Sequence, residues 1–216
     1  MDISTLIGPT LPAGQPELRA VTATTIFGAF TRRGTSGALG NDTDHALLLG
    51  VREWADCVLV GAGTVRAEGY GSSDTPTVIV SGSLDLDPSS DLFNGTVAVA
   101  TPAHSLDDAS LAPRREALRS AGARLIPTGS GSAHEVVDAV RSLGYTRISC
   151  EGGPSLYAAL FSAGLVDVLH LTVDPSLSGE DGPAGLSLDS TDTHRFTLEA
   201  AEWERDSMLF CRYRYG

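Results

Sequence analysis

Two glycine-rich segments, each directly after a short apolar run, are the parts of this sequence best suited to hold a ligand. Cys57–Val60 runs into Gly61-Ala62-Gly63-Thr64, and Arg147–Cys150 runs into Glu151-Gly152-Gly153-Pro154. Glycine lets the backbone approach a ligand closely, and the free N–H groups of a turn or helix start attract anions without a charged side chain. Both segments therefore predict strand ends that cradle phosphate, which favours a nucleotide cofactor.

The first segment departs from the dinucleotide-binding fingerprint. It begins like G-x-G-x-x-G, but Arg66 stands where the third glycine belongs, which disfavours an ordinary Rossmann dehydrogenase. Two interpretations stay open: a tight turn that holds no ligand, and a phosphate site to which Thr64 donates a hydroxyl hydrogen bond. Arg66 is likewise either a partner for a phosphate or a solvated surface charge.

The second segment combines more chemical features in one place. Glu151 puts a carboxylate at the end of an apolar strand, two glycines bring the backbone close, and Pro154 opens a helix whose positive end faces the same spot. This combination predicts a pyrophosphate site beside a carboxylate. The alternative is that Glu151 interacts only with the helix dipole, which is worth about 0.3–1 kcal/mol.

Composition excludes several reaction classes. All 15 basic residues are arginine, so the chain lacks the lysine of a P-loop and the amine nucleophile of pyridoxal phosphate or Schiff-base chemistry. The net charge of −12 argues against nucleic acid or an anionic membrane as a partner. We expect no metal, signal peptide or membrane span. Cys57, Cys150 and Cys211 lie far apart in apolar runs, which favours buried thiols in a reducing cytoplasm.

The remaining sequence supplies the elements that position these segments. Short β-branched runs alternate with amphipathic segments, and longer strand-like runs without intervening helices follow near the end. This order predicts one α/β domain, residues 18–216, with a mixed sheet, helices on both faces and an antiparallel C-terminal hairpin. Because prolines and a glycine interrupt residues 1–17, we expect an irregular N-terminal arm there. The expected strands are Leu18–Thr25, Cys57–Val60, Thr77–Ser81, Gly95–Ala100, Ala123–Ile126, Arg147–Cys150, Val166–Val173, Arg195–Ala201 and Ser207–Tyr215, and the expected helices are Asp42–Trp54, Pro113–Ala121, His134–Leu143 and Pro154–Ala163.

Several stretches together resemble the pyrimidine reductases of riboflavin biosynthesis, the C-terminal reductase half of the bifunctional deaminase-reductase. They are Ser36-Gly37-Ala38-Leu39-Gly40, the run from Ala55 through Gly61-Ala62-Gly63-Thr64 to Glu68, Glu151-Gly152-Gly153-Pro154-Ser155-Leu156, and Ala163-Gly164-Leu165-Val166-Asp167 with Pro175. The resemblance implies a dihydrofolate-reductase-like fold, in agreement with the strand pattern.

The resemblance also implies a reaction and the residues that serve it. The reaction is NADPH-dependent reduction of 5-amino-6-(5-phosphoribosylamino)uracil, a phosphorylated pyrimidine whose sugar opens to an imine and accepts hydride at C1′. A cytoplasmic homodimer is implied as well. The substrate residues would be Ser36, Arg52 and Glu151, and Glu151 would also be catalytic, either as an ionised hydrogen-bond acceptor or as a proton donor. The cofactor residues would be Thr24, Ala38, Thr64, Glu68, Gly152, Gly153, Pro154, Ser155 and Leu156. The glycine-rich motif itself adds Gly61 and Gly63. Because lysine is absent, we predict that Arg66 or a hydroxyl of the Ser81–Ser83 turn selects the 2′-phosphate.

One departure from the family bears on the substrate. The family's Ser-Leu-Asp-Gly turn is here Thr25-Ile26-Phe27-Gly28, so Phe27 replaces an aspartate, and Arg32 or Arg33 would have to supply the basic residue that commonly follows. Two other functions therefore stay open: an NADPH reductase for a pterin-like or small carbonyl or imine substrate, and a non-catalytic dinucleotide-binding homologue. For Arg52 the alternative is an i,i+4 ion pair with Asp56 on an exposed helix face.

Overall fold

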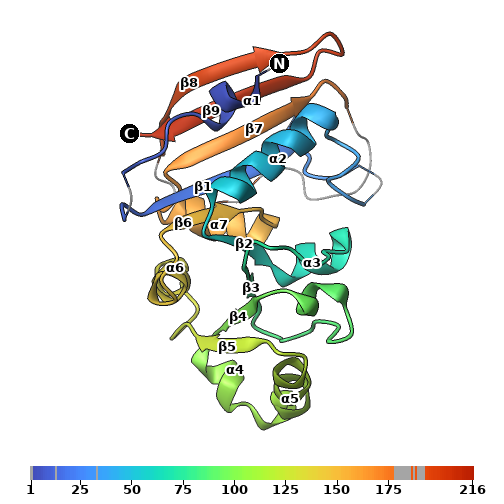
Figure 1. The fold of residues 1–216 in the computed structure, drawn as a ribbon, viewed down its shortest axis with the longest axis vertical. Coiled ribbons are helices and arrows are strands. Elements are labelled where there is room, and N and C mark those ends of the chain that lie inside the picture. The colour runs from blue at the N-terminus through green and yellow to red at the C-terminus, as the bar shows by residue number, and fades with distance from the viewer. Residues whose placement is uncertain (1, 13, 33, 178–185, 187, 189–192) are drawn as a thin grey trace.

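The computed structural model describes residues 2–12, 14–32, 34–177, 186, 188 and 193–216. Over these residues, nine strands form one sheet in the order β5-β4-β3-β2-β6-β1-β7-β9-β8 (Figure 1). The strands are β1 (Glu17–Thr25), β2 (Cys57–Gly61), β3 (Thr77–Val80), β4 (Val97–Thr101), β5 (Arg124–Pro127), β6 (Arg147–Cys150), β7 (Val168–Asp174), β8 (Phe196–Trp203) and β9 (Leu209–Tyr215). The helices are α1 (Ile3–Ile7), α2 (Asp42–Trp54), α3 (Ala62–Glu68), α4 (Ala103–Asp107), α5 (Ala112–Ser120), α6 (Ala133–Ser142) and α7 (Pro154–Ser162).

The sheet is parallel from β5 to β7 and antiparallel beyond. Strand β7 pairs parallel with β1 and antiparallel with β9, and β8 pairs antiparallel with β9. This mixed arrangement confirms the predicted fold class, including the antiparallel C-terminal hairpin, which forms the upper end of the molecule in Figure 1.

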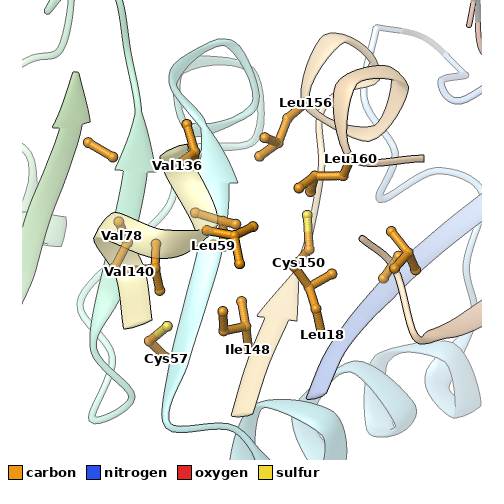
Figure 2. Packing of buried hydrophobic residues seen from close by; sticks show 14 of the residues in the cluster. Leu18, Cys57, Leu59, Val78, Val136, Val140, Ile148, Cys150, Leu156 and Leu160 are labelled. Atoms are coloured by element: carbon orange, nitrogen blue, oxygen red, sulfur yellow. The ribbon is translucent and has the colours of Figure 1, made fainter. Parts of the chain in front are cut away.

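Helices cover both faces of the sheet. On one face, α6 and α7 pack against the inner strands, and Figure 2 shows Leu59, Ile148 and Leu18 of the sheet near Val140 of α6 and Leu160 of α7. On the other face, apolar residues of α3 and α5 cover β2, β3 and β4, and those of α1 and α2 cover β1 and β9. Burial on both faces explains why β2, β3 and β4 are almost wholly apolar.

Two predicted helices begin where their capping residues indicate. The Asn41 side chain accepts hydrogen bonds from the N–H groups of Thr43 and Asp44 at the start of α2, at 3.0 Å each. Ser132 and Glu135 form the predicted capping box at the start of α6. Such caps satisfy N–H groups that have no partner inside the helix, and this fixes the starting residue.

The N-terminal arm is more ordered than predicted. Ile3–Ile7 form a short helix capped by Asp2, and Leu6 is fully buried against α2, so the expectation of an irregular arm is wrong for these residues. The guanidinium of buried Arg19 donates to the carbonyl oxygens of Ile7, at 2.7 Å, and Pro9, at 3.0 Å. These contacts between the arm and β1 supply the order that the Pro- and Gly-rich sequence does not indicate.

A second difference lies after β2. The segment expected as a glycine-rich turn is the start of helix α3, with Gly61 as its N-cap in an extended conformation. Neither Gly61 nor Gly63 has a positive φ, so the backbone conformation does not require glycine at either position. No helix in the described ranges is long and apolar enough to cross a membrane.

Candidate active site

A cleft of about 1000 Å³ lies between α2, the middle of β1, the start of α3 and the turn that follows β6. Both glycine-rich segments reach it. Strands β2 and β6 are parallel neighbours in the sheet, so the segments that follow them emerge at the same edge. The sequence-predicted site residues that line the cleft are Ser36, Arg52, Gly61, Gly63, Thr64, Glu68, Glu151, Gly153, Pro154, Ser155 and Leu156.

The charged centre of the cleft is an ion pair between α2 and the end of β6. Arg52 Nε donates to Glu151 Oε1 and Arg52 Nη2 to Glu151 Oε2, both at 2.6 Å, which is a bidentate pair. The Glu151 side chain is 3% exposed and that of Arg52 is 25% exposed. The hydrogen bonds to Glu151 raise the pKa of Arg52 above its already high value, so the guanidinium stays charged.

Tyr70 completes this group. Its hydroxyl donates to Glu151 Oε2 at 2.7 Å, and the Arg52 guanidinium lies 5.5 Å from the centre of its ring. Burial, together with the neighbouring Glu151 carboxylate, raises the pKa of Tyr70, so the phenol keeps its proton. Sequence reasoning did not identify Tyr70, because it lies in a loop after α3 where no periodicity marks it.

The structure excludes the simpler interpretation of Arg52. Asp56 does not pair with it; its carboxylate accepts instead from the backbone N–H groups of Thr146 and Arg147, at 2.9 and 2.8 Å, and from the Arg147 guanidinium. Asp56 thus joins the end of α2 to the start of β6, and Arg52 pairs instead with Glu151 at the end of β6.

The Glu151-Gly152-Gly153-Pro154 turn requires both of its glycines. Gly152 has a φ of +87°, and a Cβ there would lie 2.7 Å from Cζ of Tyr157. A Cβ on Gly153 would lie 2.5 Å from Oγ1 of Thr64, because this turn packs against the start of α3. The N–H of Gly61 donates to the carbonyl of Gly152 at 2.6 Å, which fixes the two glycine-rich segments side by side.

Gly63 behaves differently from these two. A Cβ at this position would meet nothing within 4 Å, although the residue lines the cleft. Neither the backbone conformation nor the packing therefore requires glycine at this position, and space is open beside the first turn of α3.

Five predicted cofactor residues do not line the cleft: Thr24, Ala38, Arg66, Ser81 and Gly152. Thr24 is buried on β1 beyond the lining residue Ala23, and the Ala38 carbonyl accepts from Arg32. The Ser81 hydroxyl accepts from the N–H of Leu84 at 3.0 Å. Arg66 is half exposed on the surface; it donates to the Asp85 carbonyl at 2.6 Å and lies 3.8 Å from the Asp85 carboxylate.

The family is decided by a comparison over almost the whole chain. The family described as the RibD C-terminal domain matches residues 16–209. The chain belongs to this family. A pyrimidine reductase-like protein from Corynebacterium diphtheriae is 31% identical, with a TM-score of 0.85, and the match covers 100% of this chain and 99% of that one. This result confirms the resemblance to the riboflavin pyrimidine reductases, and with it membership of a family of oxidoreductases.

Two further solved structures show the same fold at lower identity. Acinetobacter baumannii RibD is 18% identical with a TM-score of 0.74, over 94% of this chain and 59% of that one. Dihydrofolate reductase from Enterococcus faecalis, solved in complex with NADP(H), is 13% identical with a TM-score of 0.51, over 94% of this chain and 98% of that one. No curated protein matches the chain.

Phe27, which we expect to replace an aspartate of the family, lies outside the cleft lining. Phe27 is 81% exposed in the turn after β1. Arg32 lies 3.5 Å from the Asp174 carboxylate, and Arg33 falls outside the described residues. His170, in contrast, is buried in β7, where burial lowers its pKa to about 3 and keeps the ring neutral.

Proposed function

We propose that this RibD-type domain is an NADPH-dependent reductase of 5-amino-6-(5-phosphoribosylamino)uracil in riboflavin biosynthesis. The observation that carries the proposal is the joining of Arg52 and Glu151 beside the two glycine-rich segments in one cleft. A polar pair next to an anion-binding backbone suits a substrate placed against a dinucleotide.

The residues present fit such a cofactor. Gly63 leaves open space at the start of α3, and the start of α7 at Gly153 offers backbone N–H groups to a pyrophosphate. Bound NADPH would supply the hydride for the opened sugar C1′. Gly61, Thr64, Glu68, Pro154, Ser155 and Leu156 would hold it along the cleft, with Thr24, Ala38 and Gly152 supporting them from behind the lining.

The protein's own contribution would be orientation and a fixed charge pattern. Arg52 donates to both oxygens of the Glu151 carboxylate and Tyr70 donates to Oε2, so the carboxylate is held in place and can accept a substrate hydrogen bond without moving. Ser36 is positioned by Glu68, whose Oε1 accepts from the Ser36 N–H at 2.7 Å. A preorganised polar site of this kind lowers the reorganisation needed as charge develops on the substrate.

Selection of NADPH over NADH is proposed for the surface turn after β3. Two arginines converge there: Arg66 donates to the carbonyl of Asp85 at 2.6 Å, and Arg114 donates to that of Ser83 at 2.9 Å. Both lie near the Asp85 carboxylate, and both are about half exposed. A 2′-phosphate bound at this turn would replace the Asp85 carboxylate as the partner of the arginines and form a bidentate contact with a guanidinium. Ser81, the residue after β3, would lie beside it. Arg66→Ala should lower the NADPH-to-NADH affinity ratio.

Arg52→Ala tests the substrate site. We expect loss of binding and turnover of the aminouracil with NADPH affinity kept, as measured by Trp54 and Trp203 fluorescence and by the fall in NADPH absorbance. Arg119→Ala removes an equal charge from the exposed end of α5 and is the matched control. Equal loss of both affinities in Arg52→Ala would contradict a substrate role.

Two other functions are compared in the same assay. A pterin-like or small imine substrate stays open because Phe27 is expected to replace a family aspartate, and oxidation of NADPH with dihydrofolate but not the aminouracil would establish it. Binding of NADPH without oxidation by any substrate would establish a non-catalytic homologue.

A homodimer in the cytoplasm is proposed as well. Edge strand β8 exposes Leu198 at 51% and Trp203 at 74%, apolar side chains that a second copy would cover. Light scattering of the wild type and Trp203→Glu tests this, since the variant should be monomeric. Cys57, Cys150 and Cys211 are free and buried, which suits a reducing compartment.

A further inference from the structure

A carboxyl group with no role in the proposal above lies at the other end of the cleft. Asp44 belongs to the first turn of α2, and Asp44, Leu48 and Arg52 follow one another at intervals of four residues, so they share one face of the helix. All three line the cleft. At 1.5 Å per residue, about 12 Å of helix separates Asp44 from Arg52. Leu48, which is apolar, lies between Asp44 and Arg52 on this face of the helix.

The surroundings of Asp44 partly remove it from water. Its carboxyl packs against Gly40, where a Cβ would lie 2.9 Å from the carboxyl carbon. Among the described residues, the hydrogen-bond donor to this carboxyl is the side chain of Thr172, a buried residue of β7. Burial raises the pKa of Asp44, and the Thr172 hydrogen bond and the nearby His45 oppose this only in part. A carboxylate has about four acceptor sites, so one donor leaves it with unused capacity.

Two other carboxylates in the cleft lining already have hydrogen-bond partners. Glu151 is held by Arg52 and Tyr70, and Glu68 accepts from Ser36. The acidic and basic side chains in the lining are those of Asp42, Asp44, His45, Arg52, Glu68 and Glu151, so acids outnumber bases. Of the two remaining carboxylates in the described lining, Asp42 is exposed, whereas Asp44 is partly buried and shares the helix face of Leu48 and Arg52, which places it to receive hydrogen-bond donors from a ligand.

We propose that Asp44 is a substrate-recognition residue that binds the paired N–H edge of an aminopyrimidine ring. A 6-aminouracil ring presents its N1–H and the neighbouring exocyclic N–H side by side, and the two oxygens of one carboxylate match that pair. With the ring seated on Leu48, the remaining substituents point along the cleft toward Arg52 and Glu151. The proposal rests on the proposed function, because it assigns the heterocycle of that reaction to one end of the same cleft.

The test compares two small probes that differ in one amino group. Purified protein is titrated with 6-aminouracil and with uracil by ligand-observed NMR, without NADPH. Hydrogen bonds to a charged group are worth enough that we expect 6-aminouracil to bind at least about 10-fold more tightly than uracil. Asp44→Asn should reduce the ratio to within about threefold, because an amide offers a donor where the ligand also offers one. Glu53→Gln removes the same charge from an exposed position at the other end of α2, outside the cleft lining, and should keep the ratio.

Each outcome decides the proposal. Equal binding of the two probes by the wild type overturns it, whatever the variants do, and so does an unchanged ratio in Asp44→Asn. If that variant fails to fold, as judged by circular dichroism, Asp44→Ser takes its place. An unchanged ratio in Asp44→Ser would overturn the proposal in the same way. A separate NADPH titration distinguishes failure of the proposed function: no NADPH binding with a retained probe preference refutes the reductase but leaves Asp44 as a recognition residue.

Discussion

Replacing Gly63 with alanine distinguishes the effect of this glycine on folding stability from its effect on cofactor binding. Gly63 is the second residue of α3, its φ is not positive, and a Cβ would meet nothing within 4 Å. Alanine is favoured over glycine in helices by up to about 1 kcal/mol, partly because glycine has more conformational freedom to lose on folding. We therefore expect Gly63→Ala to raise the free energy of unfolding of the free protein by about 0.5–1 kcal/mol.

The same methyl group should weaken NADPH binding. The proposed site brings a phosphate against the first turn of α3, and a Cβ would fill the space through which the backbone N–H groups are approached. Loss of even one hydrogen bond to a charged group, at about 1.5 kcal/mol, corresponds to an affinity loss of about 10-fold. Chemical denaturation of the free protein and fluorescence titration with NADPH measure the two effects separately.

A more stable protein that binds NADPH about as tightly as the wild type would refute the proposed approach of the cofactor to α3. A less stable free protein would show that the fold itself needs this glycine. Gly152→Ala is the contrasting variant, because its φ of +87° and the close Tyr157 ring require glycine without any ligand. It should destabilise the free protein by more than about 1 kcal/mol.

Three further predictions concern the neighbouring residues. Tyr70→Phe removes one hydrogen bond from Glu151 but keeps the Arg52 pair, so substrate affinity should fall about fivefold, for a hydrogen bond worth about 1 kcal/mol, with NADPH affinity unchanged in fluorescence titration. Burial would raise the pKa of Asp56, but hydrogen bonds from Arg147 and Thr146 outweigh it and lower the pKa from 3.8 to about 2. A carboxyl group with a lowered pKa stabilises the folded protein above about pH 4, and this contribution is lost as the pH falls toward 2. In urea titrations, the free energy of unfolding of the wild type should therefore exceed that of Asp56→Asn by about 2 kcal/mol less at pH 2 than at pH 4. Burial raises the pKa of Cys57 and Cys150 to about 12, so neither should react with a thiol reagent at neutral pH until the protein is unfolded.

The elements that could be predicted from sequence are those whose signals are local. Asp42–Trp54 forms a helix with the predicted bounds, since Asn41 caps its start and its apolar side chains face the sheet. The capping box at Ser132 and the proline at the first position of α7 likewise mark helix starts by short-range chemistry. The alternation of apolar strands and helices was enough to give the mixed sheet.

The features that were missed depend on contacts between distant parts of the chain. Helix α1 is fixed by Arg19 and by packing of Leu6 on α2, and nothing in the Pro- and Gly-rich arm indicates either contact. Helix α3 has no side-chain cap at Gly61. In the site, the partner of Arg52 lies 99 positions away, although Asp56 is closer in sequence and correctly spaced for an ion pair.

The way in which Glu151 is held explains why Arg52 should affect substrate more than cofactor. The backbone N–H of Glu151 donates to the Leu59 carbonyl at 3.0 Å, and the carbonyl of the next residue, Gly152, accepts from Gly61 at 2.6 Å. The turn that would bind the cofactor is therefore fixed by main-chain bonds to β2, whereas the carboxylate above it is fixed by side chains from α2 and the Tyr70 loop. Removing Arg52 frees the carboxylate while leaving those main-chain bonds in place. A parallel loss of NADPH affinity would mean that the turn depends on the ion pair rather than on the sheet.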